Sequence, residues 1–286
     1  MLIRDFIALG DSFTEGMSDE LRADGHHRGW SDRVAEQLAA VTPLRYANLA
    51  VRGKLLDEVV VEQLYPARSL VDDAAHTLVS FHAGPNDLLR PGADTRGVAL
   101  RYERAVRVLS DTGVRVLLFT VIPRAGGKGR TATALAERFE SFNETVRATA
   151  ARHGALLADQ GRLPALQDRR MWDLDRLHLN PEGHARVAAL VLSTLKLNPQ
   201  MMAGLNPKTP PEVQVQPGDD RTPDPAEWWL QPLPPAPPTS RRQDLAADAV
   251  WFRRHLLPWV GRRLRGTSSG DGRQPKDVTL SPFPPS

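Results

Sequence analysis

The sequence predicts an α/β fold in which helices cover both faces of a five-stranded parallel sheet. Short apolar runs alternate with longer stretches of helical periodicity over the first 200 residues, and this alternation is typical of a parallel sheet. The predicted strands are Ile3–Leu9, Arg45–Asn48, Thr77–His82, Val114–Val121 and Ala155–Ala158. The predicted helices are Trp30–Ala40, Leu55–Leu64, Arg96–Ser110, Ala132–Arg152 and Pro181–Leu195. Glycines and polar residues follow three of the strands, at the carboxyl ends where such sheets form their sites.

The composition excludes several classes of protein and of chemistry. The chain has 286 residues, of which 41% are hydrophobic, so it can bury a full core and is long enough for one domain with an appendage. The net charge of +3 gives no general argument for nucleic acid, and the absence of cysteine excludes disulfides and a cysteine nucleophile. Arg4 and Asp5 interrupt the apolar start, which therefore does not resemble a secretory signal. We expect a cytoplasmic protein, because no apolar run reaches the roughly 18 residues that span a membrane.

A candidate nucleophile lies in the turn Gly10–Gly16, which follows the apolar run Phe6–Leu9. Ser12 is at the carboxyl end of a predicted strand, with backbone N–H groups beside its hydroxyl. Such a position suits attack on an ester or amide carbonyl. Many serines in such turns only cap a helix, so the partners of Ser12 decide its role.

The candidate base is His178, which lies in the loop before a predicted helix. Asn180 has the character of that helix's N-cap and Pro181 of its first residue. Asp175, three residues before His178, can reach the second imidazole nitrogen. An isolated Asp-x-x-His is more often a surface contact. His184, on the helix itself, is predicted to be structural.

Two further segments could stabilise a developing oxyanion. Gly53 ends the segment Asn48–Gly53 and could present its N–H without a side chain in the way. Asn86, in Gly84-Pro85-Asn86-Asp87, carries a neutral amide donor. Each segment taken alone is an ordinary turn.

Taken together, these four blocks resemble the SGNH hydrolase superfamily, also called the GDSL esterases and lipases. The resemblance covers residues 1 to about 200. Within the superfamily, the sequence most resembles soluble actinobacterial members with Arg28-Gly29-Trp30 and Asn48–Gly53. The first block reads Gly-Asp-Ser-Phe where the family name has leucine. The resemblance implies a flavodoxin-like three-layer α/β/α sandwich, the SGNH hydrolase fold.

The resemblance also implies the roles of the site residues. Ser12 would be the nucleophile, His178 the base and Asp175 the carboxylate that orients it. The Ser12 and Gly53 N–H groups and the Asn86 side chain would form the oxyanion hole. No metal or other cofactor is implied. Neighbouring Asp11 and Asp87 are instead expected to hold the loops through hydrogen bonds to backbone N–H groups.

The predicted function is hydrolysis of a small carboxylic ester through an acyl-enzyme. An acyltransferase or a thioesterase would use the same residues, and the sequence does not separate these from an esterase. A catalytically silent binding module is the alternative from another class. The presence of Ser12, Asp175, His178 and Asn86 argues against it.

The composition changes after residue 200, since 16 of the 24 prolines fall in residues 201–286. We divide the chain into a hydrolase domain (1–200), a Pro-rich linker (201–240) and a basic amphipathic segment with a flexible tail (241–286). The aromatic face of that segment is predicted to pack back on the domain, helped by Trp228 and Trp229. Weak attachment to an anionic membrane surface is the alternative.

One short pattern in this last segment matches another hydrolase class. Residues 266–270 read Gly-Thr-Ser-Ser-Gly, the Gly-x-Ser-x-Gly form of the α/β-hydrolases. No apolar strand precedes the pattern, and no aspartate and histidine follow in suitable order. We therefore assign Ser268 no nucleophilic role.

Overall fold

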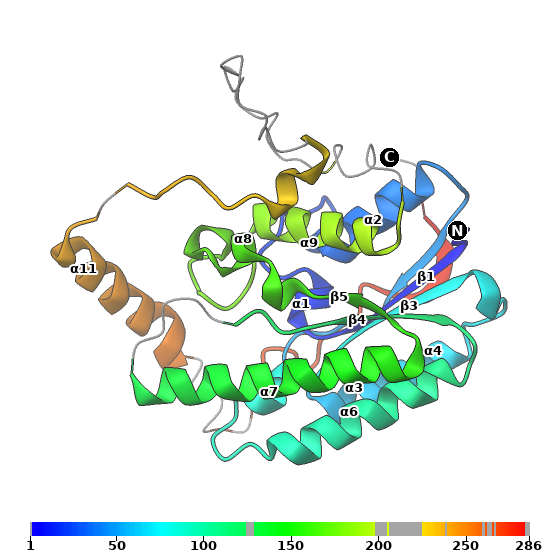
Figure 1. Cartoon of the computed structure of the whole chain (residues 1–286), viewed down its shortest axis with the longest axis horizontal. Helices are drawn as coiled ribbons and strands as arrows, with labels where there is room; N and C mark the ends of the chain where they lie inside the picture. Colours follow the sequence, from blue (N-terminus) through cyan, green and yellow to red (C-terminus); the bar gives the residue numbers. More distant parts are fainter. Residues whose placement is uncertain are drawn as a thin grey trace.

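A six-stranded sheet forms the centre of the molecule in the computed structural model (Figure 1). The structure describes residues 2–123, 129–197, 205, 225–237, 239–258, 261, 265 and 267–283. The strand order is β5-β4-β3-β1-β2-β6. The strands are β1 (Asp5–Gly10), β2 (Arg45–Asn48), β3 (Thr77–His82), β4 (Arg115–Phe119), β5 (Leu156–Ala158) and β6 (Asp277–Pro282). The first five are parallel and confirm the predicted α/β class.

The sixth strand corrects the prediction of a five-stranded sheet. β6 pairs antiparallel with β2, with Tyr46 opposite Ser281. The Phe283 N–H then donates to Leu44 O at 2.8 Å, and the Phe283 ring packs on Tyr46 at 5.3 Å. We expected a flexible tail here. The strand was missed because most of β6 is exposed and its pairing partner, β2, is distant in the sequence. Pro282 is tolerated because β6 is an edge strand.

Helices cover both faces of the sheet (Figure 1). One face carries α2 (Gly29–Ala39), α8 (Pro164–Gln167) and α9 (Pro181–Thr194), and the other carries α3 (Leu56–Val59), α4 (Tyr65–Arg68), α6 (Thr95–Ser110) and α7 (Arg130–His153). In β1, Phe6 and Ala8 belong to the first core and Ile7 and Leu9 to the second. All residues of β1 are buried, as a strand covered on both faces requires.

The predicted helix Leu55–Leu64 is continuous in space but changes type along its length. A π-helical turn, η1 (Val60–Leu64), separates α3 from α4. This turn buries Gln63, whose Oε1 accepts from Gly10 N at 2.8 Å and whose Nε2 donates to Gly10 O at 2.9 Å. The π turn therefore fixes the end of β1 at Gly10, two residues before Ser12. Such turns often occur at functional sites.

Short helices complete the described part of residues 1–200. They are α1 (Ser12–Glu15), η2 (Ala74–His76), α5 (Pro85–Leu88), η3 (Gln160–Arg162) and η4 (Arg169–Met171). α1 and α5 follow β1 and β3 closely, so both lie at the carboxyl edge of the sheet.

We call the described residues from 225 to 283 the C-terminal extension. It contains η5 (Pro225–Leu230), α11 (Arg241–Trp251), η6 (Phe252–Leu256) and β6. Trp228 and Trp229 are 9% and 5% exposed in the first core, and the Trp228 ring stacks on the Arg186 guanidinium. Much of the predicted Pro-rich linker, residues 206–224, lies outside the described residues.

One side of the extension exposes apolar side chains. Apolar side chains of α11 and its continuation are exposed, namely Leu245, Val250, Phe252 and Leu257. No helix in the described part of the chain is long and apolar enough to cross a membrane. Attachment to a membrane surface stays a prediction, as does the cytoplasmic location.

Candidate active site

The turn after β1 carries Ser12 as the first residue of α1. Asp11 is the N-cap, and its Oδ1 accepts from Phe13 N at 3.0 Å. Asp87 Oδ2 accepts from Leu56 N at 2.9 Å. These two bonds confirm that Asp11 and Asp87 hold the loops through backbone N–H groups.

Asp175 and His178 form a close pair in the loop before α9. Asp175 Oδ2 lies 2.5 Å from His178 Nδ1, and Oδ1 accepts from the N–H groups of Leu177 and His178 at 2.8 and 3.0 Å. Burial raises the pKa of the Asp175 carboxyl, but the bond and charge of His178 and the backbone donors outweigh it and lower that pKa to about 2. The carboxylate is therefore ionised at neutral pH.

The cap predicted after this loop is present. Asn180 is the N-cap of α9, its side chain accepts from Gly183 N at 3.0 Å, and Pro181 is the first helical residue. His184, predicted to be structural, is buried on α9 with its Nε2 3.0 Å from Met17 O. Burial lowers the pKa of His184 to about 4, so it is neutral at pH 7 and donates this bond.

The two candidate oxyanion segments lie at the same edge of the sheet. Asn86 Nδ2 donates to Asp11 Oδ2 at 3.2 Å and to Lys54 O at 3.0 Å. Gly53 has φ +77°, a conformation that favours glycine. The adjacent Arg52 N–H donates to the Glu15 carboxylate at 2.6 Å, and the Arg52 guanidinium pairs with that carboxylate. The loop that carries Gly53 is thus tied to the end of α1.

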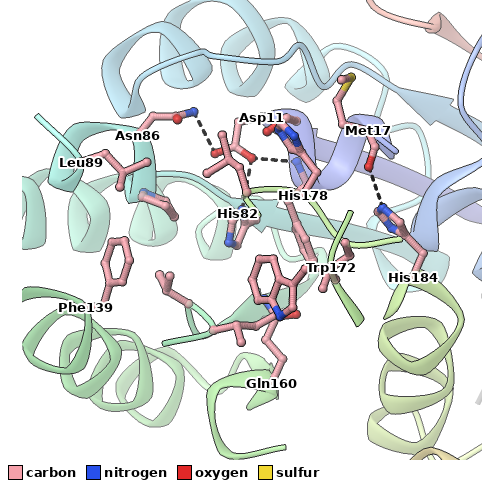
Figure 2. A pocket seen from close by; sticks show the side chains of 17 residues that line it. Asp11, Met17, His82, Asn86, Leu89, Phe139, Gln160, Trp172, His178 and His184 are labelled. Carbon is pink, nitrogen blue, oxygen red and sulfur yellow. Dashed lines mark hydrogen bonds and ion pairs between the residues drawn. The ribbon is translucent and has the colours of Figure 1, made fainter. Parts of the chain in front are cut away.

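Two cavities meet at these residues. The first, which we call the apolar cavity, has a volume of about 100 Å³, and Figure 2 shows the side chains that line it. Its apolar lining comprises Phe13, Met17, Pro85, Leu89, Val121, Ile122, Phe139, Trp172, Leu177 and Leu179. Ser12, Asn86 and His178 also line it.

The second cavity, which we call the extension cavity, has a volume of about 330 Å³. Its lining includes all five predicted site residues: Ser12, Gly53, Asn86, Asp175 and His178. The structure therefore brings together residues that lie far apart in the sequence.

Some residues at this site were not found by sequence reasoning. Gln63 and Glu15 hold the two loops described above, and His82 lines the apolar cavity with its ring 4.5 Å from that of Phe13. Trp251 and Ser268 of the C-terminal extension line the extension cavity. Apart from Ser268, whose Gly-x-Ser-x-Gly pattern is described above, none of these has a local signal that distinguishes it from an ordinary polar or aromatic residue.

No group of three or more His, Asp or Glu side chains within the described residues could hold a metal ion. The metal-independent chemistry implied by the resemblance stays a prediction.

Solved structures of other proteins have a similar fold. The acetyl-xylooligosaccharide esterase Axe2 of Geobacillus stearothermophilus, in a variant form, is 16% identical with a TM-score of 0.55, and the match covers 68% of this chain and 95% of that one. A lipolytic protein of the G-D-S-L family from Veillonella parvula is 18% identical with a TM-score of 0.55, over 68% and 98%. The lipase/acylhydrolase of Enterococcus faecalis is 20% identical with a TM-score of 0.50, again over 68% and 98%. At these identities the likeness shows the fold.

The sequence itself identifies the family. No curated protein matches the chain. The profile of the GDSL-like lipase/acylhydrolase family matches residues 8–186, which include Ser12, Gly53, Asn86, Asp175 and His178. The chain therefore belongs to the GDSL-like lipase/acylhydrolase family, a family of esterases and lipases.

Proposed function

We propose that this protein is a serine carboxylic ester hydrolase that works through an acyl-enzyme on Ser12. The observation that carries the proposal is the extension cavity, because a nucleophile, a histidine–carboxylate pair and two candidate oxyanion donors all line it. The apolar cavity that meets it gives room for the apolar part of a substrate.

The His178 tautomer follows from the state of Asp175. Because the pKa of Asp175 is about 2, its carboxylate accepts a hydrogen bond at neutral pH, so Nδ1 of His178 carries the proton. Nε2 is then the free base. In the proposed first step, Ser12 Oγ attacks the ester carbonyl carbon while Nε2 takes the hydroxyl proton.

The negative charge that develops on the carbonyl oxygen needs donors. In the proposal these are the N–H groups of Ser12 and Gly53 and the side-chain amide of Asn86. Both Asn86 N–H groups are engaged in the free protein, and the bond to Asp11 is the longer one at 3.2 Å. We expect the oxyanion to replace that bond, which would link formation of the charge to a small movement of Asn86.

Collapse of the tetrahedral intermediate breaks the bond to the alcohol oxygen, which takes the proton from His178 Nε2 and leaves. Water then attacks the acyl-Ser12 carbonyl as His178 Nε2 accepts its proton. The bond from the acyl carbon to Ser12 Oγ breaks, Oγ takes that proton from His178, and the acid is released. His178 accepts and then releases one proton in acylation and one in deacylation, so no co-reactant other than water is needed.

A fluorophosphonate probe tests the nucleophile. We expect covalent labelling of the wild type and no labelling of Ser12→Ala, since the probe reacts with an activated serine. Ser268→Ala is the matched control because Ser268 lines the same cavity, and its labelling should persist. Absence of labelling in folded wild type, or labelling that survives in Ser12→Ala, would contradict the proposal.

A further inference from the structure

The C-terminal extension forms one wall of the extension cavity. Ser12, Gly53 and Asn86 line it from the hydrolase domain, whereas Trp251 and Arg254 line it from the extension. His255, Ser268 and Ser269 add to the same wall. The space next to the proposed nucleophile is therefore shaped by two regions of the chain.

Specific contacts hold this wall against the loop of Asp175. Trp251 Nε1 donates to the backbone carbonyl of Asp175 at 2.8 Å. The Arg176 guanidinium lies 4.8 Å from the Trp251 ring centroid and pairs with Asp248 at 2.7 Å. Arg176 has φ +58°, a conformation that is uncommon for a non-glycine residue. The contacts of α11 thus fall on the Asp175 carbonyl and on Arg176, which has a left-handed backbone.

A second part of the extension reaches the loop of Gly53. A Cβ atom on Gly270 would lie 1.9 Å from Arg52 O, so the two backbones are in direct contact. Ser268 Oγ occupies the place where a side chain on Gly53 would be, at 2.1 Å from an ideal Cβ. The turn is braced internally, because Asp271 Oδ2 accepts from Ser268 N at 2.8 Å.

An ion pair fixes the end of the extension to the domain. Lys276 Nζ lies 2.5 Å from Asp32 Oδ2 and donates to His27 O at 2.8 Å. Both side chains are buried, with Asp32 fully inaccessible. The strand β6 follows directly and pairs with β2. The wall is therefore anchored at both of its ends, in the Asp175 loop and at the sheet edge.

The lining of the extension cavity contains an arginine, Arg254. Arg254 lines the extension cavity and is exposed, and it has no ion-pair partner among the described residues. Among the described residues of the lining, Asp175 is the only acidic one, and its oxygens are already bonded to His178 and two backbone N–H groups. A guanidinium without an ion-pair partner among the described residues, in a cavity also lined by Ser268 and Ser269, favours a carboxylate or phosphate ligand.

We propose that the extension cavity binds the alcohol part of an ester that carries a negative charge, with Arg254 as the counter-ion. This inference rests on the proposed ester hydrolysis at Ser12. The apolar cavity would then take the acyl part, so the scissile carbonyl lies where the two cavities meet, beside Ser12, Asn86 and His178. The extension sets which alcohol is released.

Matched aryl esters test the charge preference. Phenyl butyrate is compared with its 3-carboxyphenyl and 3-phosphonooxyphenyl analogues, which present the two sources of negative charge. We expect a higher kcat/KM for at least one anionic ester in the wild type. Arg254→Gln should lower kcat/KM for that ester about tenfold, mainly through KM, and leave phenyl butyrate within about twofold. Arg254→Lys should retain part of the preference, and Arg254→Glu should reverse it.

Arg253→Gln is the matched control, since Arg253 is the adjacent exposed arginine and does not belong to the lining. It should leave the preference unchanged. Equal kcat/KM for neutral and anionic esters in the wild type, or an equal loss for both in Arg254→Gln, would overturn the inference. Fluorophosphonate labelling of Ser12 in the same samples separates this outcome from failure of the proposed hydrolysis, which would abolish the labelling itself.

Discussion

The hydrolase domain and the C-terminal extension contribute to the same cavity in different ways. In the domain, the site loops are held by bonds to the backbone, the buried bonds of Gln63 to Gly10 and the partly buried bond of Glu15 to Arg52. In the extension, Arg254 is exposed and has no partner among the described residues. The site loops of the domain, which are fixed by hydrogen bonds, suit bond formation, because that step needs preorganised geometry. An unpaired charge suits selection of a ligand.

The largest expected effect follows from Asp175→Asn, which removes from the hydrolase domain the carboxylate that orients His178. The amide presents donors as well as an acceptor to Nδ1, so His178 is no longer held in the tautomer with Nε2 free. We expect kcat for a neutral aryl ester to fall about 10⁴-fold. Asp173→Asn is the control, because that neighbouring side chain bonds Ser18 Oγ instead. Similar kcat values for the two variants would argue that Asp175 does not orient His178.

The next effect concerns the anchor of the extension. Lys276→Met leaves the buried Asp32 with the more distant Arg22 guanidinium, 3.8 Å away, in place of its close ion pair, and at pH 7 we expect the free energy of unfolding to fall by about 3 kcal/mol. Urea unfolding measures this loss. Asp32→Asn in the same background should recover much of the lost stability, and a loss that persists in the double variant would point to packing instead of charge.

The pH dependence of that loss has a defined sign. Burial raises the pKa of Asp32 from 3.8 to about 6, although Lys276 opposes the shift. A raised carboxyl pKa means that folding favours the protonated form, so the Asp32 contribution becomes less stabilising as pH rises from about 4 through 6. Without Lys276 this pKa rises further. The cost of Lys276→Met should therefore be smaller at pH 5 than at pH 7.

The smallest effect tests the contact between the two regions directly. Gly53→Ala requires a left-handed alanine and a side chain in the place of Ser268 Oγ. We expect a loss of about 2 kcal/mol in the free energy of unfolding, together with a lower kcat because the Gly53 N–H moves. Ser268→Gly should restore part of both quantities by removing the clash. If Ser268→Gly gave no recovery, the turn of the extension would not lie on Gly53 in solution.

Much of the hydrolase domain follows from local sequence. The five parallel strands are recognisable because each is a short apolar run followed by a turn, and the N-cap Asn180 lies directly before Pro181. The site residues could be found because each of the four blocks carries its chemistry within a few residues, as Asp175 and His178 do. The topology then brings the blocks to one edge of the sheet.

The remaining features depend on contacts between distant segments. Gln63 reaches Gly10 only because the helix widens into a π turn, and nothing in Val60–Leu64 indicates that turn. β6 is a mostly exposed edge strand whose register is set by β2. Ser268 was assigned no nucleophilic role, and its place in the cavity comes from the backbone contact of Gly270 with Arg52. Such pairings leave no periodic pattern in either segment.

Trapping the acyl-enzyme is the most direct test of the division between the two regions. Enzyme mixed with an aryl butyrate is quenched in acid within one turnover and digested, and the peptides are examined by mass spectrometry. The account predicts one butyryl group on the peptide that contains Ser12, and none on the peptide that contains Ser268. A butyryl group on Ser268, or rapid turnover of the ester by Ser12→Ala, would contradict the claim that the hydrolase domain performs the chemistry while the extension selects the alcohol.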